Sequence, residues 1–124
     1  MEAKNKALAA AQAAYGKKGQ NLTIIDIGAE SSYADCLVIV SAYSDRQTSA
    51  IADAIVDELK NEYGLRPMVR EGQGSWVLID YGDVVIHVFH EDARAFYDLE
   101  RLWSKAPRVP VPAFETASAS AMTH

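Results

Sequence analysis

The sequence contains almost no cysteine, no membrane-length apolar run and no excess of basic residues, and each absence excludes a class of protein. The single cysteine, Cys36, cannot form an internal disulfide. A buried free thiol in a reducing, cytoplasmic setting is its simplest explanation. No apolar stretch approaches the roughly 18 uninterrupted residues that a membrane span requires. Association with a membrane is therefore not expected.

The balance of charge argues against binding to nucleic acid. Acidic residues outnumber basic ones 17 to 12, which gives a formal net charge of −5. Proteins that bind nucleic acid through its phosphates usually carry an excess of Lys and Arg. An acidic chain suits a basic protein partner better, because complementary charge accelerates encounter. Cysteine and histidine do not occur at zinc-binding spacings, and we expect no cofactor or metal.

The pattern of apolar residues predicts one α/β domain. Helical spacing indicates a helix over residues 2–15, and a capping box at Ser44 and Gln47 opens a second helix that ends at Gly64. A third helix is predicted over residues 92–103. Runs rich in β-branched residues predict strands at 22–27, 36–41, 67–70, 76–80 and 84–90. This order predicts a mixed five-stranded sheet with helices packed against it.

The last twenty residues differ in composition from the rest. Pro107, Pro110 and Pro112 fall within six positions and prevent a helix. We therefore predict a domain over residues 1–104, followed by a Pro-rich tail over 105–124 that is extended or flexible unless it docks elsewhere.

A hairpin motif carries the clearest resemblance to a known family. Residues 76–89 are WVLIDYGDVVIHVF and are similar to the signature hairpin of the iojap-like ribosomal silencing factors. Residues 94–103, RAFYDLERLW, resemble the closing helix of that family. The shorter matches ADCLVI, SDRQ, IAD and EG precede them in the expected order. The resemblance thus covers about residues 4–104, and the tail departs from it.

This resemblance implies a function without catalysis. It implies a nucleotidyltransferase-like core that binds the large ribosomal subunit through its interface-side protein number fourteen. A protein bound there prevents the small subunit from joining and represses translation when nutrients are short. The resemblance also implies that free copies can pair as homodimers. A large-subunit assembly factor, which leaves before initiation, is the non-enzymatic alternative.

The docking residues are predicted from strand and helix periodicity together with this resemblance. Trp76, Leu78 and Asp80 share one face of their strand. His87 is explained equally well as an interface donor and as a half-buried histidine bonded across the sheet. In the last helix Phe96, Leu99 and Trp103 form a stripe expected to be core. The full predicted set of ribosomal-protein-binding residues is Trp76, Leu78, Asp80, His87, Arg94, Tyr97 and Leu102.

Two carboxylates raise an enzymatic alternative, a metal-dependent nucleotidyltransferase. Such enzymes hold Mg²⁺ with paired carboxylates and place phosphate at a Gly-Ser turn. Asp80 and Asp83 straddle a hairpin turn, so their side chains need not converge. The chain before the capped helix, residues 41–44, contains no glycine. A turn-forming role for Asp83 is therefore favoured, and no catalytic residues are assigned.

Overall fold

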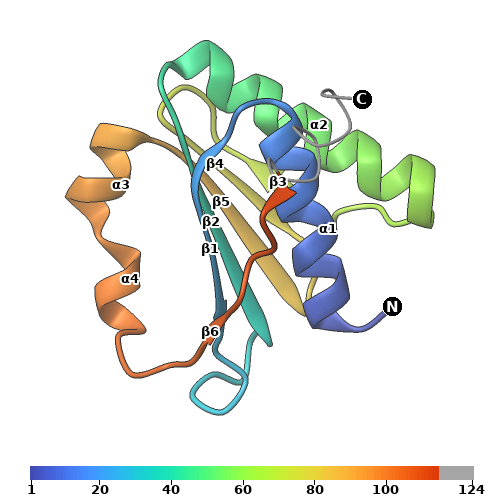
Figure 1. The fold of residues 1–124 in the computed structure, drawn as a ribbon, viewed down its shortest axis with the longest axis vertical. Coiled ribbons are helices and arrows are strands. Elements are labelled where there is room, and N and C mark those ends of the chain that lie inside the picture. Colours follow the sequence, from blue (N-terminus) through green and yellow to red (C-terminus); the bar gives the residue numbers. More distant parts are fainter. Residues whose placement is uncertain (115–124) are drawn as a thin grey trace.

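A computed structural model of the chain describes residues 1–114. A six-stranded sheet has two helices, α1 (Ala3–Gly16) and α2 (Asp45–Tyr63), on one face. Two short helices, α3 (Glu91–Tyr97) and α4 (Leu99–Leu102), lie on the other face (Figure 1). The strands are β1 (Gln20–Asp26), β2 (Cys36–Ala42), β3 (Val69–Glu71), β4 (Trp76–Asp80), β5 (Val84–His90) and β6 (Arg108–Val109). Among these residues, no helix has the length and apolar character needed to cross a membrane.

The sheet is mixed, as the sequence predicted. Its strand order is β3-β4-β5-β2-β1-β6, with β2 and β5 parallel and every other pair antiparallel. All seven residues of β2 are buried, which explains why its sequence is a continuous apolar run rather than an alternating one. The larger core lies between the sheet and the helices α1 and α2.

The start of α2 confirms half of the predicted capping box. The Ser44 hydroxyl accepts a hydrogen bond from the Gln47 backbone N–H at 3.1 Å. The Gln47 side chain accepts from the backbone N–H of Tyr43 at 2.6 Å, one residue earlier than the box requires. At the other end Gly64 has a φ of +68° and ends the helix as predicted.

The predicted count of five strands is wrong, because the Pro-rich segment contributes a sixth. In β6, Val109 pairs with Ile24 and Arg108 pairs with Ile25, both in β1. Proline excludes a helix, but it is compatible with an edge strand, where one row of backbone groups needs no partner. Val111 and Phe114 then pack against the larger core. The rest of the predicted tail, residues 115–124, lies outside the described residues.

The predicted closing helix is broken at Asp98. This residue has a φ of +48°, so α3 ends before it and α4 begins after it. We call residues 91–103, which comprise both short helices and Trp103, the arm. The break shifts the helical phase, and the predicted core stripe divides: Leu99 and Trp103 pack against the sheet, whereas Phe96 is 80% exposed.

Candidate docking surface

An aromatic cluster lies where β4 and β5 meet the arm. Trp76 pairs with Phe89 across the two strands, and their ring centroids are 4.9 Å apart. Tyr97 of the arm packs on Trp76 at 4.6 Å, and Phe96 meets Tyr97 edge-on at 5.1 Å. The cluster runs from fully buried Phe89 to exposed Phe96. The apolar core therefore continues to the surface at this point.

Trp76 is oriented from beneath by His87. The indole N–H donates a hydrogen bond to Nδ1 of His87 at 3.0 Å. His87 is only 6% exposed, and its burial lowers the pKa from 6.5 to about 4. The imidazole is therefore neutral near pH 7 and can accept this bond. His87 supports the surface without presenting a polar group to solvent.

The same face of the sheet continues along β4 and onto β3. Leu78 and Asp80 follow Trp76 at two-residue spacing, and all three are half-buried. Glu71 of β3 lies beside Leu78. A shallow hollow of about 270 Å³ is lined by Glu71, Gly72, Trp76 and Leu78. A hollow with apolar walls and a carboxylate at its rim can accept an apolar side chain next to a basic one.

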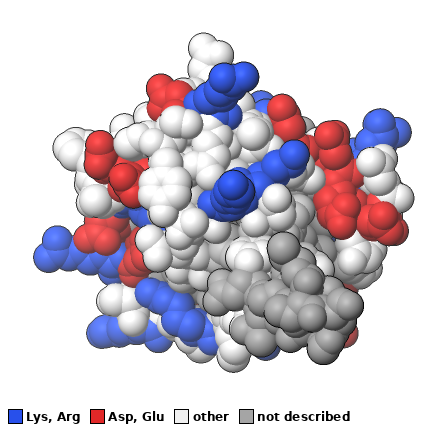
Figure 2. Space-filling view, turned by 45° about the horizontal axis from the view of Figure 1, so that its top comes forward, with Lys and Arg blue, Asp and Glu red and all other residues white. Residues whose placement is uncertain are grey.

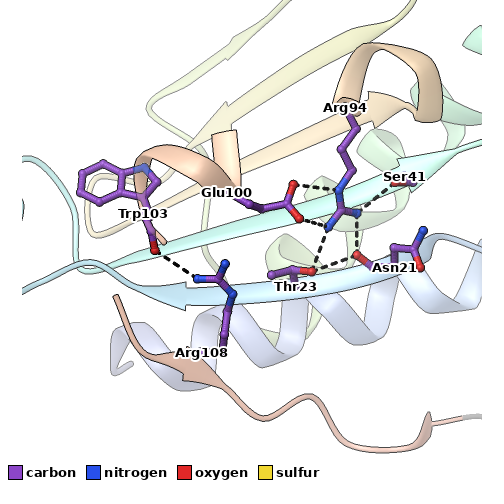
Figure 3. Close-up of polar contacts among 7 residues, drawn as sticks. All are labelled: Asn21, Thr23, Ser41, Arg94, Glu100, Trp103 and Arg108. Carbon is purple, nitrogen blue, oxygen red and sulfur yellow. Dashed lines mark hydrogen bonds and ion pairs between the residues drawn. The ribbon is translucent and has the colours of Figure 1, made fainter. Parts of the chain in front are cut away.

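Arg94 points away from this surface. Its guanidinium binds Glu100 and the β1 and β2 residues Thr23 and Ser41 (Figure 3). The side chain is only 11% exposed. The structure therefore does not place Arg94 among the groups that a partner can touch, although Arg94 belongs to the predicted docking set.

The structure brings part of the predicted docking set together. Trp76, Leu78 and Asp80 line one strand face, Tyr97 contacts Trp76, and Leu102 is 73% exposed on the arm. His87 and Arg94 lie beneath the surface instead. Phe96 was missed, because its exposure depends on the break at Asp98. The one available signal was the tolerance of aspartate for positive φ, which is weak inside an otherwise helical pattern.

We call the six outward residues the docking surface: Trp76, Leu78, Asp80, Phe96, Tyr97 and Leu102.

The two carboxylates of the enzymatic alternative have separate partners. Asp80 accepts from the backbone N–H of Gly82 at 2.7 Å, whereas Asp83 pairs with the ammonium of Lys6 in α1 at 2.7 Å. Within residues 1–114, no group of three or more His, Cys, Asp or Glu side chains is placed to hold a metal ion. Each of the two carboxylates is thus held by a contact of its own, Asp80 within the hairpin turn and Asp83 with α1.

Surface charge is mixed in sign. On the face shown in Figure 2, outside the grey region, the Lys and Arg side chains form small separate groups. Asp and Glu side chains lie among them. Proteins that grip nucleic acid usually present a basic stripe or patch. The coloured part of this face shows no such stripe, and acidic side chains lie beside the basic ones.

The fold and the docking surface define a small α/β protein with an open aromatic face, and comparison with known proteins gives its family. The model described as "Ribosomal silencing factor during starvation" matches residues 1–124. The chain is 42% identical over 100 residues to the ribosomal silencing factor RsfS of Bacillus subtilis, which covers 79% of this chain and 84% of that relative. This chain belongs to the ribosomal silencing factor family.

More distant relatives and solved structures agree with this assignment. A mitochondrial Iojap-related protein of Arabidopsis thaliana is 35% identical over 92 residues, which is 70% of this chain and 50% of that protein. A crystal structure of a Chromobacterium violaceum protein matches with a TM-score of 0.81 at 33% identity, covering 91% of this chain and 93% of the other. A Bacillus halodurans structure matches with a TM-score of 0.71 at 38% identity, covering 83% and 94%.

Proposed function

We propose that this chain binds the large ribosomal subunit through its protein fourteen and represses translation by blocking the small subunit. The observation that carries the proposal is the aromatic group formed by half-buried Trp76 and exposed Tyr97 and Phe96, in a chain whose relatives are named ribosomal silencing factors. Contiguous apolar surface of this kind marks protein–protein contact sites. Aromatic side chains are also enriched among residues that dominate binding energy.

Charge at the surface suits a basic partner. Glu71 borders the hollow beside Trp76, and Asp80 continues the row along β4. The chain as a whole is also acidic. Such complementarity speeds encounter and fixes register more than it adds affinity, so the aromatic residues are expected to supply most of the binding free energy. Silencing then requires no catalysed reaction, because the bound protein occupies the volume that the small subunit must enter.

Sedimentation tests this function directly. Purified protein is mixed with large subunits, small subunits or joined ribosomes at near-physiological salt. We expect comigration with large subunits only, and fewer joined ribosomes when both subunits are present. Absence of comigration at micromolar concentration, or equal binding to both subunits, would contradict the proposal.

Matched variants locate the contact. Tyr97→Ala and Phe96→Ala are expected to weaken large-subunit binding by about tenfold or more, which corresponds to about 1.4 kcal/mol, while the chain stays folded. Tyr63→Ala is the control, because Tyr63 is 49% exposed, much like Tyr97, but belongs to α2 on the opposite face of the sheet. Equal affinity of all three variants would remove the arm from the interface.

A further inference from the structure

The arm carries half of the docking surface but has little packing of its own. Neither α3 nor α4 contains a fully buried residue. Ala93, Leu99 and Trp103 are only partly buried against the small core on this face. Isolated helices of this length are not stable in water. The position of Phe96, Tyr97 and Leu102 therefore depends on other contacts that tie the arm to the sheet.

Arg94 supplies such contacts with every donor that it has. A guanidinium carries five N–H groups. Two bind the carboxylate of Glu100, at 3.2 and 3.1 Å. Two more bind the hydroxyls of Thr23 and Ser41, both at 2.9 Å. The fifth binds the backbone carbonyl of Asn21 at 2.6 Å. Figure 3 shows how these acceptors from β1, β2 and the arm converge on one side chain.

Two backbone irregularities make this convergence possible. In a continuous helix, residues six apart lie about 240° around the axis and about 9 Å along it. Arg94 and Glu100 could not meet in that geometry, and the break at Asp98 brings them together. In β1, the register shifts between Gln20 and Thr23, and Asn21 has a φ of +51°. This bulge leaves the Asn21 carbonyl free to accept from Arg94.

We infer that Arg94 is a positioning residue for the docking surface. Its bonds to Glu100 fix the bend of the arm, and its bonds to β1 and β2 fix the arm on the sheet. Together they hold Tyr97 against Trp76. The consequence for binding rests on the proposed function, whereas the structural step concerns the free protein alone. Arg94 contributes to affinity without touching the partner.

Fluorine NMR of protein labelled with 5-fluorotryptophan tests the structural step. The chain has two tryptophans, Trp76 under Tyr97 and Trp103 in the arm, and Trp103→Phe assigns the two signals. Arg94→Met is expected to shift or broaden both signals and to lower large-subunit affinity by about tenfold. Arg94→Lys keeps the positive charge but loses the planar guanidinium with its five donors. Its fluorine spectrum and its large-subunit affinity should therefore lie between those of the wild type and those of Arg94→Met. The control is Arg101→Met, an equal change in charge at an exposed position of the same arm.

The outcomes separate this inference from the function on which it rests. A wild-type spectrum for Arg94→Met would show that the arm holds without Arg94 and would overturn the inference. An altered spectrum with unchanged affinity would overturn the role in binding. If Arg94→Met does not fold, Glu100→Gln replaces it, with smaller changes expected in the same directions. If the wild type itself fails to bind large subunits, the proposed function is wrong, and the spectra still decide whether Arg94 positions the arm.

Discussion

The indole N–H of Trp76 donates to Nδ1 of His87 across the β4–β5 ladder, and this 3.0 Å bond joins a half-buried residue of the candidate docking surface to a buried base. Only the form of the ring with a lone pair on Nδ1 can accept it. Burial enforces the neutral form, because it disfavours the imidazolium and lowers the pKa of His87 to about 4. The orientation of the indole is therefore linked to the protonation state of His87.

This link predicts a dependence of stability on pH. An unfolded histidine has a pKa near 6.5, whereas that of folded His87 is about 4, so the unfolded chain binds the proton more readily. The contribution of His87 to the free energy of unfolding is fully present above about pH 6.5 and is lost as the pH falls toward about 4. The loss should reach up to roughly 3 kcal/mol. Urea unfolding at about pH 7 and about pH 4.5 measures it.

The matched variants for this prediction are two histidine substitutions. His87→Asn keeps an acceptor for the indole but does not titrate, so its stability should fall less than that of the wild type over this range. His90→Asn preserves the bond from the Asp92 N–H to the side chain, and should follow the wild type. Parallel loss of stability in the wild type and in His87→Asn would show that other groups cause the acid sensitivity.

Gly72 is predicted to be essential for the hollow beside Trp76. It has a φ of +88°, and a Cβ added there would collide with the backbone carbonyl oxygen of Trp76. Gly72→Ala should therefore lower the free energy of unfolding by more than about 1 kcal/mol and displace the start of β4. Gly16→Ala is the control, because a Cβ there meets nothing within 4 Å. Equal unfolding midpoints for both variants in urea would contradict the predicted clash at Gly72.

The pair formed by Lys6 and Asp83 is predicted to stabilise the fold. Its side chains are 10% and 32% exposed, and its atoms are 2.7 Å apart. Lys6→Met should cost roughly 1–3 kcal/mol of unfolding free energy, because it leaves a half-buried carboxylate without its cation. Adding Asp83→Asn should recover part of that loss. The more exposed pair of Lys4 and Asp26, at 3.7 Å, is the comparison, and Lys4→Met should cost less than about 0.5 kcal/mol.

Much of the fold could be predicted from local patterns. The capped helix α2, the buried strand β2 and the β4–β5 hairpin each have a periodicity or a turn signal that their own residues determine. The sixth strand could not be predicted in the same way. Arg108 and Val109 form a strand only because the edge of β1 lies beside them, and two residues between prolines carry no strand pattern.

The candidate site was predictable where it follows strand alternation. Trp76, Leu78 and Asp80 share a face because side chains alternate along β4. The inward orientation of Arg94 could not be predicted, because three of its five hydrogen bonds reach acceptors far away in the sequence. Ser41 is 53 residues from it and Asn21 is 73 residues from it. Helical periodicity cannot reveal an inward orientation that depends on a distant bulge and on a helix break.

The extent of the folded domain can be tested by truncation. A chain ending after Ser104 would contain the whole predicted domain but would lack β6. It would also lose the bond from the Asp26 N–H to the Pro107 carbonyl, at 2.8 Å. Val109, Val111 and Phe114, which pack on the larger core, would be removed as well. We expect this chain to be less stable than a chain ending after Phe114 by roughly 2–4 kcal/mol.

The chain ending after Phe114 is the reference for this comparison, because it keeps every described residue. Urea unfolding of the two chains measures the difference in free energy. Large-subunit binding should also be weaker for the shorter chain, because it lacks Arg108, which donates to the Trp103 carbonyl at the end of the arm, and Ala106, which is buried in the small core under the arm. Equal stability would mean that the two-residue pairing and the packing of Phe114 contribute nothing, and the domain would then end at residue 104. Lower stability together with weaker binding would place the boundary beyond β6 and would show that this segment supports the arm as well as completing the sheet.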